Sequence, residues 1–341
     1  MPRTTRTIPT NASLSIPSMR WRFPNISHKH VEKSIREPLD TRDAAAERKE
    51  RLEQSTLAND NAYDAMVFSS GGSRGIGHLG AIDMLERQHP GSVEKCRYFI
   101  GSSAGAVVAT ILAMGISAKD GMDAYIVPFR YRKDIRLHLM STLFGIEGGK
   151  SLEDFLETVV PKEVTFKDIL DVHGTVLSII GSNLNTSTME VFDAIRTPDM
   201  SVYSALRISC AVPLLFTAVR MNGQYYVDGA ITNPFPMSVA HDIYGCRRIL
   251  GLRFDTYATN LDATSQDKPW TLDYFLGAVV DTLIHSSTMH VPARRGVVAD
   301  VCTIQTPNDV TGISFDIPAE KKYEIFDAGG ESMLTFLKKM S

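Results

Sequence analysis

Short apolar runs separated by glycines are the first regular feature of the chain, and they begin near Tyr63. The run Ala65–Ser69 is followed by a glycine-rich turn and by a segment that we expect to be helical, Gly75–Gln88. A second run, Arg97–Gly101, leads directly into small apolar residues from Ala104 to Met114. Short strands that alternate with helices in this way are typical of parallel sheets. The pattern therefore predicts an α/β fold, a three-layer sandwich with a mainly parallel central sheet and helices on both faces.

Further elements are expected toward the C-terminus. The same patterns predict four strands, at Thr175–Asn183, Met189–Asp193, Gln224–Val227 and Arg248–Phe254. A helix is expected at Ser201–Ala211, between the second and the third of these strands. Residues 118–165 mix basic side chains with aromatic and aliphatic ones. They fit helices inserted near the mouth of a site, in contact with lipid, and equally a plain amphipathic helix pair packed on the core.

The first 60 residues differ from the rest. Up to Val31 the chain is basic, without any acidic residue, and rich in Ser, Thr and Pro. This composition predicts a disordered N-terminal arm over residues 1–60, with a short lead-in helix from Arg42 to Leu57. The arm also fits an organelle-targeting peptide or a basic segment on anionic lipid. The ordered domain is expected over residues 61–341, with its core motifs between 66 and 250.

Composition narrows the class of protein. The 341 residues are 43% hydrophobic and carry a formal net charge of −3, which suits a globular protein and gives no general attraction to nucleic acid. The longest apolar runs fall short of the ~20 residues that a spanning helix needs. We expect an intracellular protein, cytoplasmic or peripheral on a membrane. The four cysteines form no Cys-x-x-Cys pair and no His-Glu-x-x-His occurs, so we expect free thiols, no metal and no cofactor.

The segment Gly101–Gly105 reads Gly-Ser-Ser-Ala-Gly and fits the pattern G-x-S-x-G. It lies where a predicted strand turns into a predicted helix. A sharp turn there lifts the hydroxyl of Ser103 above the sheet edge, and glycines two positions away on either side let strand and helix approach closely. The N-terminus of the helix also favours negative charge that develops at the serine. Ser103 is therefore the candidate nucleophile.

A glycine-rich turn, Ser70–Gly75, follows the first predicted strand. Its backbone N–H groups could bind a phosphate or stabilise an oxyanion. The spacing of its glycines also fits the nucleotide turn of short-chain dehydrogenases. That class needs a tyrosine with a lysine four positions later, and no tyrosine of this chain has one.

The third motif is Asp228-Gly229-Ala230, at the end of a predicted strand. Asp-Gly alone is most often a turn. Beside the other two motifs, Gly229 would let the carboxylate of Asp228 point into a cleft.

In this order and context, the three motifs resemble those of the patatin-like phospholipase family. Its oxyanion loop resembles Ser70–Gly75, its serine elbow Gly101–Gly105 and its Asp-Gly box Asp228–Ala230. Two more segments, Ser182–Thr186 and Ser209–Phe216, are similar to further family segments. One departure is that the family loop usually starts with glycine, where this chain has Ser70.

The resemblance implies a lipid acyl hydrolase of the phospholipase A or acylglycerol lipase type. Ser103 would be the nucleophile and Asp228 the proton acceptor, with the N–H groups of Gly71, Gly72 and Ser73 as the oxyanion hole. Arg74 would anchor the loop or contact a phosphate. The expected partners are a phospholipid or other acyl-lipid and a peripheral membrane surface, without nucleic acid.

Three alternatives remain open. The same acyl-enzyme could serve an acyltransferase, and the chain could be a catalytically silent lipid-binding module. A Ser-Asp-His triad would need a histidine after Asp228, and His241, His285 and His290 lie there.

Overall fold

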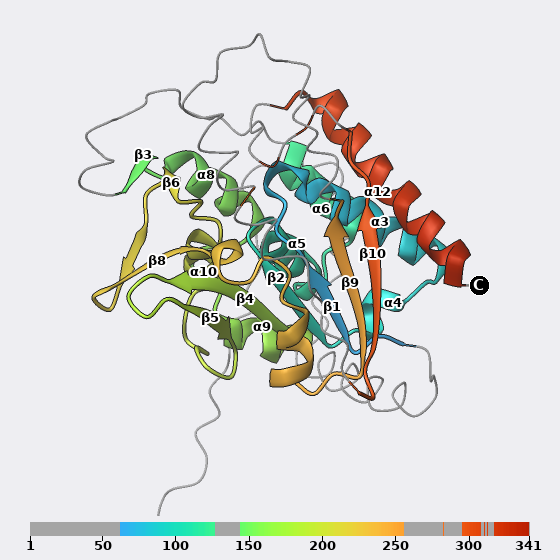
Figure 1. Ribbon diagram of the computed structural model, residues 1–341, viewed down its shortest axis with the longest axis horizontal. Helices are drawn as coiled ribbons and strands as arrows, with labels where there is room; N and C mark the ends of the chain where they lie inside the picture. The colour runs from blue at the N-terminus through green and yellow to red at the C-terminus, as the bar shows by residue number, and fades with distance from the viewer. Residues whose placement is uncertain are drawn as a thin grey trace, which may run out of the picture.

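The computed structural model describes residues 62–126, 144–255, 295–307 and 317–340, together with Thr282, Val310 and Gly312 (Figure 1). The N-terminal arm and its lead-in helix lie outside the described residues. So do the basic residues Arg130, Arg132, Lys133 and Arg136 of the predicted insertion, and His285 and His290.

A central sheet of eight strands organises the described residues. Its order is β10-β9-β1-β2-β4-β8-β7, and β5 also pairs with β4. The five strands from β10 to β4 are parallel, whereas β8, β7 and β5 are antiparallel to their neighbours. The bounds are β1 Ala65–Phe68, β2 Tyr98–Ser102, β4 Val176–Asn183, β5 Thr188–Asp193, β7 Val219–Met221, β8 Gln224–Asp228, β9 Arg248–Phe254 and β10 Val298–Ile304. The sheet is mainly parallel, as the alternating pattern predicts.

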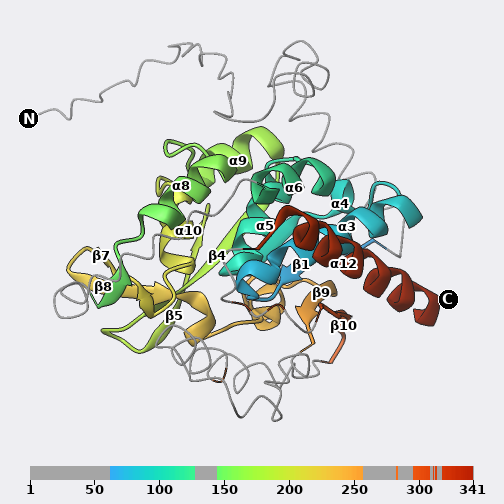
Figure 2. The same cartoon turned by 90° about the horizontal axis from the view of Figure 1, so that it is seen from above.

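The longer helices cover one face of this sheet, and α3 lies beside α12 in both views (Figures 1 and 2). Their apolar side chains share one core with Met66, Phe99 and Leu250 of the strands. The bounds are α3 Ile76–Gln88, α4 Ser92–Lys95, α5 Ala104–Ala113, α6 Ala118–Ile126, α8 Lys150–Val159, α9 Phe166–His173, α10 Val202–Ser209 and α12 Ala319–Met340. No helix in the described ranges is long and apolar enough to cross a bilayer.

The opposite face has a thinner cover. A second core joins Val67, Ile100 and Ile249 of the strands to Phe235 and Val239. The cover includes the short helices η2 (Gly229–Ile231) and η3 (Val239–Ile243). Helices on both faces were expected, and the two layers prove unequal in the described residues.

Most predicted elements form, with ends that differ by at most two residues. Several elements were missed because they are short or lack a clear period. These are β3 (Gly145–Glu147) and β6 (Leu214–Phe216), which pair in a small parallel sheet, the 3-10 turn η1 (Gly72–Gly75), and also β7, β10, α9 and α12. Of the expected insertion, α6 and α8 are present and both contribute buried residues to the main core.

Candidate active site

Ser103 occupies the junction between β2 and α5. Its backbone has φ 55° and ψ −124°, a conformation that L-residues rarely adopt and that a serine elbow requires. Its N–H donates to Ser209 Oγ at 2.9 Å, which ties the turn to α10. The side chain is only 6% exposed. Such strain persists only where the surroundings fix it, and it marks functional sites.

The two glycines of the elbow are required by close backbone approach. A Cβ atom at Gly101 would lie 2.2 Å from the carbonyl oxygen of Gly105, and one at Gly105 would lie 2.3 Å from that of Phe68. Both distances are far inside van der Waals contact. The sequence-based reason for glycine at these positions is therefore confirmed.

Asp228 ends β8 and faces Ser103. β8 pairs with β4 through Asp228 and Gly181, and Gly229 packs so tightly on β4 that its Cβ would lie 2.2 Å from Ile180 O. The Ser103 hydroxyl donates to Asp228 Oδ2 at 2.7 Å. The Ala230 N–H donates to Oδ1 at 2.8 Å and so orients the carboxylate. The structure brings the predicted pair together at hydrogen-bond distance.

Burial controls the acidity of Asp228, whose side chain is 2% exposed. Desolvation raises the pKa of this carboxyl to about 7, and the hydrogen bonds from Ala230 and Ser103 oppose that rise. A carboxylate with a pKa in this range can accept a proton at neutral pH, which an ordinary aspartate does poorly. A group of this acidity is suited to general-base chemistry.

The loop between β1 and α3 supplies backbone donors. Among the described residues, the N–H groups of Gly71 and Gly72 have no acceptor. The N–H of Ser73 donates to Gly312 O at 2.9 Å, so the third expected donor is already engaged. Gly72 has φ 55°, and a Cβ there would lie 1.7 Å from Gly312 O. Because the Ser73 N–H is engaged, the N–H groups of Gly71 and Gly72 remain as the two candidate oxyanion donors.

Neighbouring side chains hold this loop. Arg74 Nε donates to Gly71 O at 3.4 Å, and its guanidinium lies 5.4 Å from the centre of the Phe254 ring. A Cβ at Gly71 would meet that same ring at 2.2 Å. The N–H of Ser70 donates to Pro234 O at 2.8 Å, a backbone bond that does not depend on the serine side chain. These contacts agree with an anchoring role for Arg74.

No histidine of the described residues contacts Ser103 or Asp228. His78 is fully buried, bonded through Nε2 to Ser69 O at 2.9 Å, and burial lowers its pKa to about 3. It packs beside the loop, as expected. His241 pairs with Asp242 at 2.9 Å on the opposite layer.

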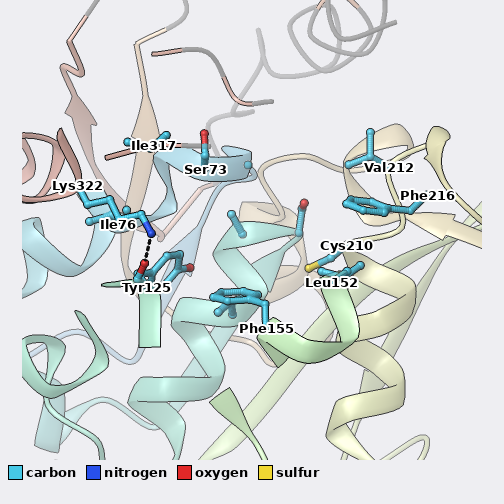
Figure 3. A pocket seen from close by; sticks show the side chains of 14 residues that line it. Ser73, Ile76, Tyr125, Leu152, Phe155, Cys210, Val212, Phe216, Ile317 and Lys322 are labelled. Carbon is cyan, nitrogen blue, oxygen red and sulfur yellow. Dashed lines mark hydrogen bonds between the residues drawn. The ribbon is translucent and has the colours of Figure 1, made fainter. Parts of the chain in front are cut away.

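An apolar cavity opens beside Ser103 (Figure 3). Side chains from α3, α5, α6, α8 and α12 converge on it, together with Cys210 directly after α10. Lys322 donates to Tyr125 O at 2.7 Å. The described lining residues, besides Ser103, are Gly72, Ser73, Ile76, Ala104, Val107, Tyr125, Leu152, Phe155, Cys210, Val212, Phe216, Ile317 and Lys322. The lining suits an aliphatic chain next to the serine hydroxyl.

Sequence reasoning missed several of these residues. Ser209 was noticed only as part of a family-like segment, although it is the acceptor that holds Ser103. Gly312, Ile317 and Lys322 come from the C-terminal region, where no motif marks them. Within the described ranges, no cluster of three His, Cys, Asp or Glu side chains could hold a metal ion.

A model of the patatin-like phospholipase family matches residues 66–241, just over half of the chain, and includes both Ser103 and Asp228. The chain belongs to the patatin-like phospholipase family. The resemblance read from the three motifs is thus confirmed. The patatin-like match ends before β9, so Phe254, Gly312 and Lys322 contribute to the site from outside it.

Two virus proteins are similar in sequence to this patatin-like chain. "Probable lipid hydrolase 463L" of Invertebrate iridescent virus 6 is 27% identical over 190 residues, which cover 52% of this chain and 63% of that protein. Protein R571 of Acanthamoeba polyphaga mimivirus is 24% identical over 288 residues, 79% of this chain and 91% of its own length. The chain thus spans less than two thirds of 463L.

Among solved structures, VipD from Legionella pneumophila is similar with a TM-score of 0.52 and 18% identity. The match covers 81% of this chain and 67% of VipD. The patatin-like fold predicted from the sequence is thus borne out.

Proposed function

We propose that this patatin-like protein is a lipid acyl hydrolase that cleaves carboxylic esters through Ser103 and Asp228. The observation that carries the proposal is the 2.7 Å hydrogen bond between a strained, buried serine and a buried carboxylate, beside an apolar cavity. Family membership supports a lipid substrate, a phospholipid or another acyl-lipid.

In the first half-reaction the Ser103 hydroxyl attacks the ester carbonyl carbon. Asp228 Oδ2 takes the proton, which its raised pKa of about 7 permits. Negative charge on the carbonyl oxygen is met by the N–H groups of Gly71 and Gly72 and by the N-terminus of α5. The C–O bond then breaks, the alcohol or lysolipid leaves with the proton from Asp228, and the acyl group stays on Ser103 Oγ.

In the second half-reaction water replaces the alcohol. Asp228 takes a proton from water as it attacks the acyl carbonyl, and the same loop stabilises the new oxyanion. The fatty acid leaves, and Ser103 regains the proton. One carboxylate acts as base and then as acid in both halves, so no histidine is needed.

The direct test is chemical labelling combined with product analysis. The full chain should react with a fluorophosphonate probe, and Ser103→Ala should abolish labelling. Incubated with a mixed panel of phospholipids and acylglycerols, it should release fatty acid, and Asp228→Ala should abolish the release. An unlabelled wild-type protein would refute the proposal. Acyl transfer to added lysolipid in place of release would favour the acyltransferase alternative.

A further inference from the structure

Two exposed apolar residues belong to neighbouring segments of the small sheet, close in sequence to residues that line the cavity. Phe144 is 51% exposed and Leu214 is 37% exposed. In the small sheet of β3 and β6, Gly145 pairs with Leu214, so Phe144 lies next to the start of β6. Figure 1 places these two strands at one extremity of the molecule, near β8. Large apolar side chains at such a position leave part of their surface in water.

Both residues also have a backbone conformation that bulky side chains avoid. Phe144 has φ 63° and Leu214 has φ 69°. Val212 O accepts from the N–H groups of Leu215 and Phe216, so Leu214 lies in a tight turn, with a positive φ that normally selects glycine or asparagine. An exposed leucine in a strained turn does not serve stability. The coincidence of strain and exposure at two neighbouring positions indicates a function.

The patch formed by Phe144 and Leu214 borders residues of the cavity on one side and an aromatic side chain with a cationic neighbour on the other. Val212 and Phe216, on either side of Leu214 in the sequence, line the same cavity as Ser103. On the other side the Phe144 ring contacts the Tyr225 ring edge-on, with centroids 5.6 Å apart.

Tyr225 in turn lies beside a cationic side chain. The guanidinium of the exposed Arg220 lies 5.8 Å from the centre of the Tyr225 ring. From Leu214 through the two aromatic rings to Arg220, the side chains are first aliphatic, then aromatic and then cationic. This order matches the profile of a bilayer from acyl chains through the interface to the phosphates.

We propose that Phe144 and Leu214, backed by Tyr225 and Arg220, are the surface through which this protein docks on a lipid bilayer. Two exposed large side chains are too few for a stable protein–protein interface, which needs about 800 Å² from each partner. They suffice for insertion into lipid, where each buried side chain adds affinity. Docking there would bring the cavity mouth to the lipid from which the substrate comes. That last step rests on the proposed function.

The test compares vesicle binding with hydrolysis. In a Ser103→Ala background, which leaves the lipid intact, the variant Phe144→Asn with Leu214→Gly should bind phosphatidylcholine vesicles roughly tenfold more weakly or worse. Asn and Gly tolerate positive φ, so its melting temperature should not fall. With Ser103 present, hydrolysis of a soluble butyrate ester should be retained and hydrolysis of vesicle lipid should drop.

The matched control is Ile195→Ser. Ile195 is 67% exposed and follows β5, at the end of the sheet away from the elbow. Vesicle binding that is unchanged in the paired variant, or equally weakened by Ile195→Ser, would overturn the docking surface. If the paired variant lost dimerisation and kept vesicle binding, the surface would be an interface with a second copy of this chain, and the docking proposal would be wrong. Failure of the wild type to cleave any ester refutes the proposed function alone, because binding is measured without catalysis.

Discussion

The elbow at Ser103 and the loop at Gly71–Ser73 follow neighbouring parallel strands, and both are glycine-rich turns that open a helix. They are held in different ways. The glycines of the elbow pack on each other and on β1, the strand next to its own. The loop is held by Phe254 and Gly312, which lie far along the chain. Both turns can be read from their local glycines, whereas the distant contacts that hold the loop in place cannot be read from a sequence motif.

The largest effect should come from the elbow itself. Gly105→Ala drives a Cβ into the backbone of β1, which cannot move without disturbing the sheet. We expect a loss of about 3 kcal/mol or more in the free energy of unfolding, together with loss of activity. Urea denaturation measures the first and ester hydrolysis the second. A stable, active Gly105→Ala protein would contradict the local packing described above.

The loop should respond through activity more than through stability. Gly72→Ala places a Cβ against Gly312 O and should displace the loop, with a fall in kcat of about 10² to 10³, the effect of losing one oxyanion donor. The free energy of unfolding should fall less than for Gly105→Ala. The matched control is Gly223→Ala, where φ is 79° but a Cβ would meet no atom within 4 Å. Equal losses of kcat in both variants would show that backbone strain, and not Gly312, is responsible.

In the proposed mechanism, Asp228 on the elbow side of the site carries out all of the proton transfer. Because burial raises the pKa of Asp228 to about 7, the reactive carboxylate is present above pH 7 and is lost as the pH falls through that value. We expect kcat/KM for a soluble ester to rise with pH through one inflection near 7, so that the rate at pH 5 is roughly a hundredth of the plateau. The profile should be unchanged in His241→Gln. A pH-independent rate would contradict this assignment.

The same burial has a consequence for stability. The folded carboxyl has a raised pKa, so the folded state binds more protons than the unfolded state between about pH 4 and 7. Stability should therefore fall as the pH rises across that range, and Asp228→Asn should reduce the fall. Chemical denaturation at pH 5 and pH 8 compares the two proteins.

The smallest effect concerns the link from the elbow to α10. Ser209→Ala removes the acceptor of the Ser103 N–H and should cost about 1–2 kcal/mol, seen as a roughly tenfold fall in kcat with KM unchanged. Ser204→Ala on the same helix removes an exposed hydroxyl and is the control. Equal kcat values for the two variants would show that the elbow keeps its geometry without α10.

The same contrast explains what the sequence could predict. The strand–turn–helix units around Ser70–Gly75 and Gly101–Gly105 were foreseen because their signals are local. Ser209 was not assigned a role because its hydrogen bond spans 106 positions. Gly312 and Lys322 were missed because the C-terminal region shows no motif. Only the fold brings Gly312 to the loop and Lys322 to the cavity. The engagement of Ser73 by Gly312 was likewise invisible in the sequence.

The central claim is that Ser103 and Asp228 act as one catalytic unit. It is tested most directly by a double-mutant cycle of Ser103→Ala and Asp228→Asn, read as kcat for ester hydrolysis. The account predicts that each single variant loses nearly as much activity as the double variant, since residues that act as a unit are non-additive. Additive losses, or an Asp228→Asn protein that retains most of its activity, would contradict it.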